Sequence, residues 1–328
     1  MTLDLRQIIL ETTKASDLVE GDILQELWSG YGKIRRYELV GSEHQSVVVK
    51  HIDLTKHGSH PRGWNNQTSH QRKLRSYQIE TAWYQNYAHH CPEACRIPRC
   101  FGVESSQHET LIVLEDLATA GFPKTPDAIG WPEIERCLSW LANFHATFMG
   151  KKPDQLWKTG TYWHLQTRPD EWQALDDQRL KDAAQAIDQV LQKTPYQTLV
   201  HGDAKLANFC FSWDQKKVAA VDFQYVGGGC GMKDVAYFIG SCLAESACER
   251  QESQILDFYF NQLKKGLKVQ GILSSYQDIE DQWRPLYPVA WTDFHRFLKG
   301  WSPGHWKIND YSERLSRQVM DGLHKDQS

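Results

Sequence analysis

Two very short apolar runs, separated by polar turns, interrupt the otherwise helix-like second half of this sequence. Residues 199–211 are LVHGDAKLANFCF, and the next apolar run, VAAV, leads into Asp222 in the tripeptide DFQ. Runs this short, bounded by Gly, Asp and Asn, are typical of strands rather than helices. Two neighbouring strands at 209–211 and 218–221 would present Asn208 and Asp222 at adjacent ends, where both could face one metal ion.

The polar residues of this block are those that phosphoryl transfer requires. Asp203, which follows a His-Gly turn, can accept a proton from a substrate hydroxyl. Asn208 and Asp222 offer the hard oxygen ligands that Mg²⁺ prefers, with phosphate oxygens completing its coordination shell. Phosphoryl transfer needs such a carboxylate, one or two Mg²⁺ ions and a cation on the phosphates.

The block resembles a known family of kinases. HGDAKLAN is similar to the catalytic loop of the aminoglycoside phosphotransferase and choline kinase family, and DFQ stands where that family carries its metal-binding Asp. The HGD, the Asn five residues after its Asp and the DFQ are most similar to the ecdysteroid-kinase-like branch. The resemblance is strongest over 199–240. It implies an α+β, protein-kinase-like fold with a small β-rich N-terminal lobe and a larger α-rich C-terminal lobe.

The resemblance also implies roles for the residues of the block. Asp203 would be the catalytic base or the carboxylate that orients the hydroxyl, and Asn208 and Asp222 would hold Mg²⁺. His201 would be a structural residue beneath the loop. Lys205, two residues after Asp203, would either contact the γ-phosphate of ATP or be a solvated side chain.

Asp234, in KDVAYF, has two interpretations. It falls where the family often has an Asp that braces the catalytic loop. It could equally be a carboxylate at a helix N-terminus, where the helix dipole favours negative charge.

Such an enzyme needs a lysine on a strand of the first lobe, paired with a glutamate on the following helix, to hold the α- and β-phosphates of ATP. Lys50 ends the strand-like SVVVK, and Glu80 lies in the helix-like SYQIETAWY. The alternatives are that Lys50 is a surface lysine at a strand end and that Glu80 is solvated, with Glu104 or Glu109 as the partner.

Two further segments are assigned to the nucleotide, one by its glycines and one by the same resemblance. Gly30 and Gly32 precede a strand about twenty residues before Lys50, so their backbone amides could cover the phosphates, although a plain turn is an equal interpretation. LIVLEDL resembles the linker between the lobes, where the backbone from Glu115 to Leu117 would meet the adenine edge.

The rest of the chain divides into a strand-rich and a helix-rich part. Polar residues 57–72 are expected to form a loop. Strands are expected at 35–39, 46–52, 99–104 and 110–114, and helices at 72–90, 132–148, 178–193, 233–265, 276–299 and 310–324. The joint near 115–127 suggests a nucleotide-binding lobe at 1–116 and a catalytic, substrate-binding lobe at 117–328.

Composition excludes several other classes of protein. The 328 residues are 41% hydrophobic and 24% charged, as in an ordinary globular protein. The net charge of −4 lacks the excess of positive charge that is typical of nucleic-acid-binding proteins. The N-terminus lacks the pattern of a secretory signal, and no apolar run is long enough to cross a bilayer. We therefore expect a cytoplasmic protein without nucleic-acid or membrane partners. The oligomeric state is not indicated.

These features predict an ATP- and Mg²⁺-dependent phosphotransferase whose acceptor is a small hydroxylated molecule. A protein Ser/Thr kinase and a catalytically silent nucleotide-binding module are the alternatives. Residues 226–233 contain no Ser, Thr or Tyr, which disfavours control by phosphorylation of an activation loop. The tryptophans and aspartates of the C-terminal segment could cage a cationic or ring-shaped acceptor, but helix packing is the interpretation we favour; they are Trp283, Trp291, Trp301, Trp306, Asp281 and Asp293.

Overall fold

The computed structural model describes residues 3–27, 30–55 and 67–325. The chain forms two compact units. The first comprises Met1–Lys124 with Cys210–Gln224, and the second comprises Thr125–Phe209 with Tyr225–Ser328. The assignment of nucleotide binding to residues 1–116 and of catalysis and substrate binding to residues 117–328 stays a prediction, because the division into compact units does not show where ligands bind.

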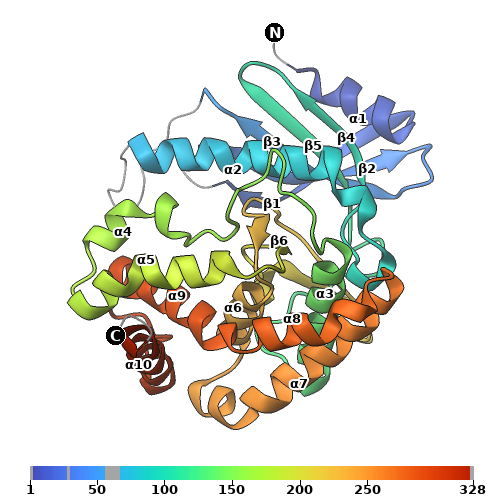
Figure 1. The fold of residues 1–328 in the computed structure, drawn as a ribbon. Coiled ribbons are helices and arrows are strands. Elements are labelled where there is room, and N and C mark those ends of the chain that lie inside the picture. Colours follow the sequence, from blue (N-terminus) through green and yellow to red (C-terminus); the bar gives the residue numbers. More distant parts are fainter. Residues whose placement is uncertain (1–2, 28–29, 56–66, 326–328) are drawn as a thin grey trace. The chain divides into compact units, whose positions relative to one another are not determined.

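The first unit is built on a five-stranded antiparallel sheet with the order β1-β2-β3-β5-β4 (Figure 1). The strands are β1 (Asp17–Glu26), β2 (Gly32–Val40), β3 (Ser46–Asp53), β4 (Cys100–Ser105) and β5 (Glu109–Glu115). The four predicted strands are confirmed. The pattern does not indicate β1, because this edge strand is polar and mostly exposed.

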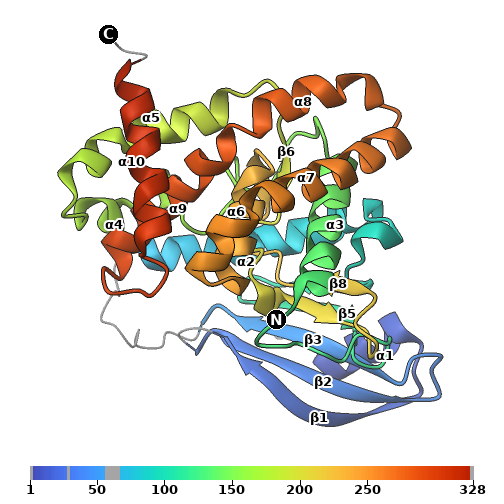
Figure 2. The same ribbon diagram turned by 90° about the horizontal axis from the view of Figure 1, so that it is seen from below.

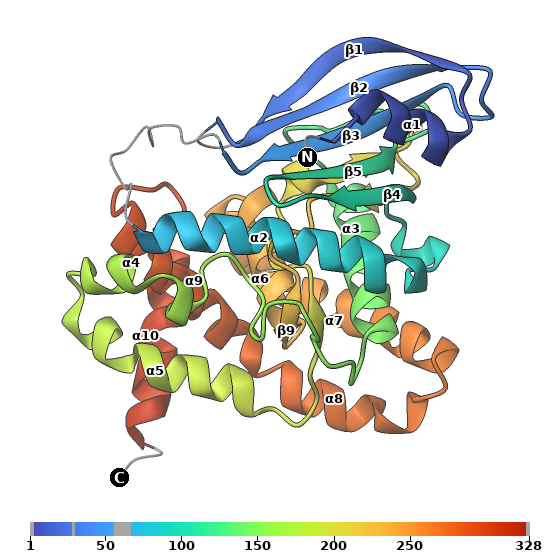
Figure 3. The ribbon, with the colours of Figure 1, turned by 90° about the horizontal axis from the view of Figure 1, so that it is seen from above.

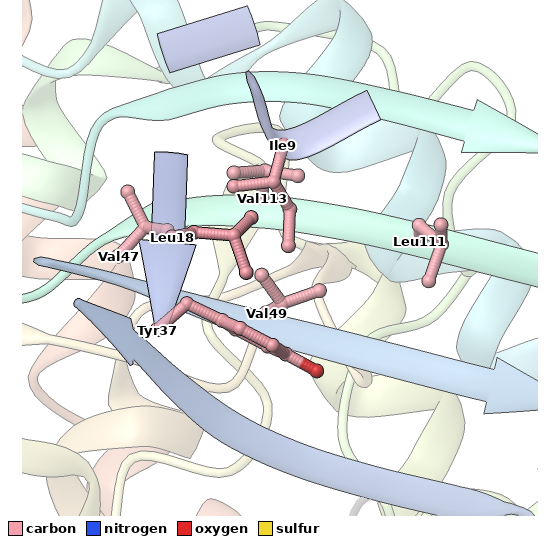
Figure 4. Close-up of a cluster of buried hydrophobic side chains, with 7 residues drawn as sticks. All are labelled: Ile9, Leu18, Tyr37, Val47, Val49, Leu111 and Val113. Carbon is pink, nitrogen blue, oxygen red and sulfur yellow. The ribbon is translucent and has the colours of Figure 1, made fainter. Parts of the chain in front are cut away.

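One face of this sheet packs against helix α1 (Leu5–Thr13), which the sequence pattern also does not indicate (Figure 3). Figure 4 shows Ile9 of α1 among side chains of the strands, including Val47 and Val49 of β3. Side chains alternate between the two faces of a strand. The register that buries Val47 and Val49 under α1 therefore turns Lys50 to the opposite face.

That opposite face packs against α2 (Gln67–Asn86), where Tyr77 contacts Ile52 of β3. The helix begins within the predicted loop 57–72, so the loop prediction is wrong for residues 67–72. Residues 57–66 of that loop lie outside the described part of the chain. The two-stranded sheet of β7 (Phe209–Phe211) and β8 (Val218–Ala220) follows the predicted strands, and the Ala220 backbone N–H donates to the Arg96 carbonyl at 3.0 Å.

The second unit is mainly helical (Figure 2). Its helices are α3 (Trp131–Thr147), α4 (Pro169–Gln173), α5 (Gln178–Lys193), α6 (Met232–Cys242), α7 (Glu245–Val269), α8 (Tyr276–Trp283), α9 (Leu286–Trp301) and α10 (Asp310–Lys325). Short 3₁₀ turns lie at Ala88–His90, Glu93–Cys95, Leu165–Thr167, Leu206–Asn208 and Leu273–Ser275. A small antiparallel sheet pairs β6 (Thr198–Val200) with β9 (Gly227–Gly229).

Two of the predicted helices are each divided in the structure. The predicted helix 233–265 ends at Cys242 and resumes at Glu245, and the predicted helix 276–299 is interrupted around Pro285. Proline lacks a backbone N–H and clashes with the preceding helical turn, which explains the second break. Helix α9 packs against α4, α5, α6 and α10. Throughout the described ranges, every helix is too short or too polar to traverse a lipid bilayer.

Candidate active site

The first unit buries a lysine–glutamate ion pair between β3 and α2. Lys50 Nζ lies 2.5 Å from Glu80 Oε2, and both side chains are almost fully buried. Burial raises the pKa of Glu80, and the charge of Lys50 opposes that shift. The predicted alternative partner Glu109 instead lies near His51 and accepts a hydrogen bond from the Leu3 backbone. The structure therefore brings together the two residues that the spacing selected.

Asp222 lies on the same side of the first unit as this pair. Its Oδ1 is 3.9 Å from Lys50 Nζ and accepts a hydrogen bond from Gln224 Nε2 at 2.8 Å. The backbone of Asp222 has φ of 70°, a left-handed conformation that Asp tolerates better than most residues. Lys73 of α2 donates to Gln224 Oε1 at 2.9 Å. The Gln of DFQ thus links Asp222 to α2.

The second unit presents Asp203 in a hydrogen-bonded cradle. Tyr237 of α6 donates its hydroxyl to Asp203 Oδ1 at 3.1 Å, and Asn208 Nδ2 donates to Oδ2 at 3.1 Å and to the Asp203 carbonyl at 2.8 Å. Burial and then the charge of Asp203 raise the pKa of Tyr237 far above its usual value. The phenol therefore stays protonated and keeps donating to the carboxylate. Lys205 Nζ lies 3.2 Å from Asp203 Oδ2, with its side chain 40% exposed.

The turn before Asp203 is fixed by Asp234. The Asp234 carboxylate is fully buried and accepts hydrogen bonds from the backbone N–H groups of His201 at 2.6 Å and Gly202 at 2.9 Å. His145 Nε2 lies 3.1 Å from the same carboxylate. Asp234 also lies in the first turn of α6. Its position therefore agrees both with a brace of the catalytic loop and with a carboxylate at a helix N-terminus. The contacts with the turn make it a brace of the loop.

The glycine of the HGD turn is required by the geometry of the backbone. Gly202 has φ of 80°, and a Cβ there would lie 2.1 Å from the Tyr225 carbonyl oxygen. Buried His201 accepts the Asp203 backbone N–H on Nδ1 at 3.3 Å. Both residues therefore shape the turn, as expected for a structural histidine.

Gly30 and Gly32 lie at the connection from β1 to β2. Gly32 has φ of 143°, and a Cβ there would lie 1.9 Å from the His51 carbonyl oxygen of β3. Its close contact with β3 is enough to require glycine. Gly30 has φ of 74°, and a Cβ there would meet no atom of the described residues within 4 Å. Contacts of either residue with phosphates stay a prediction.

The expected adenine contacts are partly engaged by the protein itself. The Glu115 carboxylate accepts from Arg96, and its backbone N–H donates to the Arg99 carbonyl at 2.8 Å. The Leu117 carbonyl accepts from Phe122 at 2.7 Å, whereas the Leu117 backbone N–H has no partner in the part of the chain that the structure describes. The Leu117 N–H is thus a donor of this linker that no described residue uses.

Most of the tryptophan-rich C-terminal segment packs inside the second unit. Trp283 and Trp291 are buried, and Asp293 is held by Arg296 at 2.9 Å. Helix packing, the interpretation favoured from sequence, describes these three residues. Trp306 is 62% exposed, so core packing does not describe this residue.

Sequence reasoning did not identify Tyr237 as part of the site. The available signal is its position three residues after Asp234, on the same face of α6. The donors present fit a magnesium nucleotide. In the second unit, Asn208 uses its amide nitrogen on Asp203, which leaves Oδ1 for a cation. In the first unit, Asp222 offers a carboxylate. Both are hard oxygen ligands of the kind Mg²⁺ binds.

Comparisons with known proteins show the family and the fold of this chain. Residues 60–157 and 151–272 match the sequence profile of the ecdysteroid kinase-like family. The chain is similar in structure to an ethanolamine kinase of Plasmodium vivax, with a TM-score of 0.52 and 10% identity over 93% of this chain and 84% of that one. It is also similar to an amicoumacin kinase in complex with AMP-PNP and Ca²⁺, with a TM-score of 0.51 and 14% identity over 99% and 94%. No curated protein sequence matches it.

These comparisons confirm the predicted fold class. At 10% and 14% identity the two structures show a common fold and nothing finer. The sequence profile covers more than half of the 328 residues and includes Asp203, Asn208 and Asp222.

Proposed function

Because this chain belongs to the ecdysteroid kinase-like family, we propose that it transfers the γ-phosphate of ATP, with Mg²⁺, to a hydroxyl group of a small molecule. The family and the fold support phosphotransferase activity. The observation that carries the finer proposal is the cradle of Asp203, in which Tyr237 and Asn208 each donate to a different carboxylate oxygen.

In this proposal Asp203 positions the acceptor hydroxyl and takes its proton as the phosphoryl group leaves ATP. Tyr237 and Asn208 hold the carboxylate in one orientation. Asn208 Oδ1 and the Asp222 carboxylate would hold Mg²⁺, which neutralises phosphate charge when bound. Lys205, which lies beside Asp203 with an exposed side chain, would contact the γ-phosphate.

Lys50 would bind the α- and β-phosphates. Its pairing with Glu80 supports this role, because a buried lysine needs a carboxylate to hold its charge in place. The backbone amides of Gly30 and Gly32 would cover the phosphates, and the backbone from Glu115 to Leu117 would contact the adenine edge.

The acceptor is proposed to be a small hydroxylated molecule. One of the similar structures is that of an enzyme named for ethanolamine, which carries such a hydroxyl. The acceptor itself would be sought by screening hydroxylated compounds, beside a generic protein mixture, for ATP-dependent phosphate incorporation.

The test compares three variants of the purified chain for ADP release with ATP and Mg²⁺. We expect Asp203→Asn to lower turnover at least about 100-fold while nucleotide binding persists. Asp222→Ala should abolish Mg²⁺-dependent nucleotide binding. The matched control is Asp214→Asn, which alters an exposed carboxylate of the β7–β8 turn and should leave both properties unchanged. Full turnover by Asp203→Asn would refute the proposal.

A further inference from the structure

A half-buried lysine of the second unit lies against a group of aromatic rings. Lys307 lies between α9 and α10, and its Nζ is 5.3 Å from the ring centre of Tyr237, 5.6 Å from that of Phe294 and 5.4 Å from that of Trp306. Distances below about 6 Å to a ring centre are those of cation–π contacts. We call the faces of these three rings the aromatic cage.

Within the described part of the chain, the contacts of the Lys307 ammonium are with the aromatic cage. Among residues 3–27, 30–55 and 67–325, no acceptor lies within hydrogen-bonding or ion-pair distance of Lys307 Nζ. Burial is the main cause that lowers the pKa of Lys307 to about 8, and the positive charge of Lys205 lowers it further, against the opposing effect of the Asp203 carboxylate. The side chain is thus still mainly an ammonium at pH 7.

The aromatic cage is next to the proposed catalytic carboxylate. Tyr237 contacts Lys307 with the face of its ring and donates its hydroxyl to Asp203 Oδ1 at 3.1 Å. The Tyr237 ring therefore separates the Lys307 ammonium from Asp203, the carboxylate that would bind the hydroxyl of the acceptor. Lys307 is therefore near enough to Asp203 for its charge to act on an acceptor whose hydroxyl binds there.

Aromatic faces beside a carboxylate attract cations. In this protein the chain supplies that cation itself, and Lys205 adds a second positive charge beside Asp203. A cationic acceptor would have to displace Lys307 from three rings or accept repulsion from both lysines. A neutral acceptor neither has to displace Lys307 nor is repelled by the two lysines, and an acidic acceptor would be attracted by them.

Resting on the proposed phosphotransferase function, we propose that Lys307 determines acceptor specificity. With its ammonium in the aromatic cage beside Asp203, the protein selects hydroxyl compounds that carry no positive charge near the acceptor hydroxyl, and it discriminates against amino alcohols and quaternary-ammonium alcohols.

The test uses two probes of the same shape and different charge: choline and its uncharged isostere 3,3-dimethylbutan-1-ol. Dissociation constants of both would be measured by ligand-observed NMR on the full chain, without turnover. We expect the wild-type protein to prefer the neutral alcohol. Lys307→Met and Lys307→Gln should shift the ratio of the two affinities toward choline by about tenfold, the size of a cation–π contact regained by the ligand.

Lys307→Arg is the matched control, because it keeps a cation over the rings and should keep the wild-type ratio. Two neutral variants, Lys307→Met and Lys307→Gln, are used so that the test still gives an answer if one of them does not fold. A ratio that changes less than twofold in both, no choline binding by either, or a wild-type preference for choline would overturn the proposal. Failure of the phosphotransferase function is seen separately, in the turnover of Asp203→Asn.

Discussion

Replacing Asp234 with asparagine separates two physical roles for this carboxylate. If it only complements the dipole of α6, its charge contributes about 0.3–1 kcal/mol. If it braces the catalytic loop, the loss is larger, because the carboxylate accepts from three donors. His201 N and His145 Nε2 share Oδ2, and Gly202 N uses Oδ1.

An asparagine side chain has one oxygen, so at least one of these donors would face an NH₂ group. A hydrogen bond to a buried charged group contributes about 1.5–3 kcal/mol. One bond lost outright, with the others weakened to neutral strength, predicts a loss of about 3–5 kcal/mol in the free energy of unfolding. Because Asp203 directly follows Gly202, a shift of the turn by about 1 Å would lower turnover about 100-fold.

Urea unfolding followed by tryptophan fluorescence and ADP release would measure the two effects. The matched control is Asp310→Asn, in the first turn of α10. Asp310 is exposed and has no side-chain hydrogen bond to any described residue, so its loss should cost at most about 1 kcal/mol. If Asp234→Asn destabilises no more than Asp310→Asn and keeps turnover within threefold, the bracing argument is wrong.

Two further predictions concern buried charge. Glu80→Gln removes the carboxylate charge that lies 2.5 Å from Lys50 Nζ and should destabilise the protein by about 3 kcal/mol, as measured by urea unfolding. It should also weaken ATP binding at least tenfold in a nucleotide titration; unchanged ATP affinity would contradict the role of the pair. Burial, aided by Lys233, lowers the pKa of His164 to about 4. In the unfolded chain His164 takes up its proton as the pH falls through about 6.5, whereas in the folded protein it does so only near pH 4. The free energy of unfolding should therefore fall by about 2 kcal/mol between pH 7 and 5. His164→Gln should reduce this pH dependence, as measured by urea titrations across that range.

Local chemistry made much of the site predictable. A strand period of two places Lys50 opposite Val47 and Val49, and a glutamate on the next helix can reach it. The HGD turn needs a residue that tolerates positive φ, which only glycine does readily. These constraints act within one or two adjacent elements, so they can be recognised in the sequence.

The additional contacts of the site lie far apart in the sequence. Tyr237 is 34 residues from Asp203, and the pattern of α6 is equally consistent with Tyr237 as an ordinary core aromatic. Lys307 follows an exposed tryptophan in a turn-rich segment and has no local feature that predicts burial against Tyr237. Their roles depend on which helices pack together.

The sequence by itself determined the elements that carry the chemistry and the spacing of Asp203, Asn208 and Asp222, because periodicity and turn propensity are local properties. Only the tertiary structure decided what surrounds each group: Glu80 rather than Glu109 beside Lys50, Tyr237 on Asp203, and a lysine in the aromatic cage. Burial and hydrogen-bond geometry arise from packing between distant segments, and no local pattern in the chain encodes that packing.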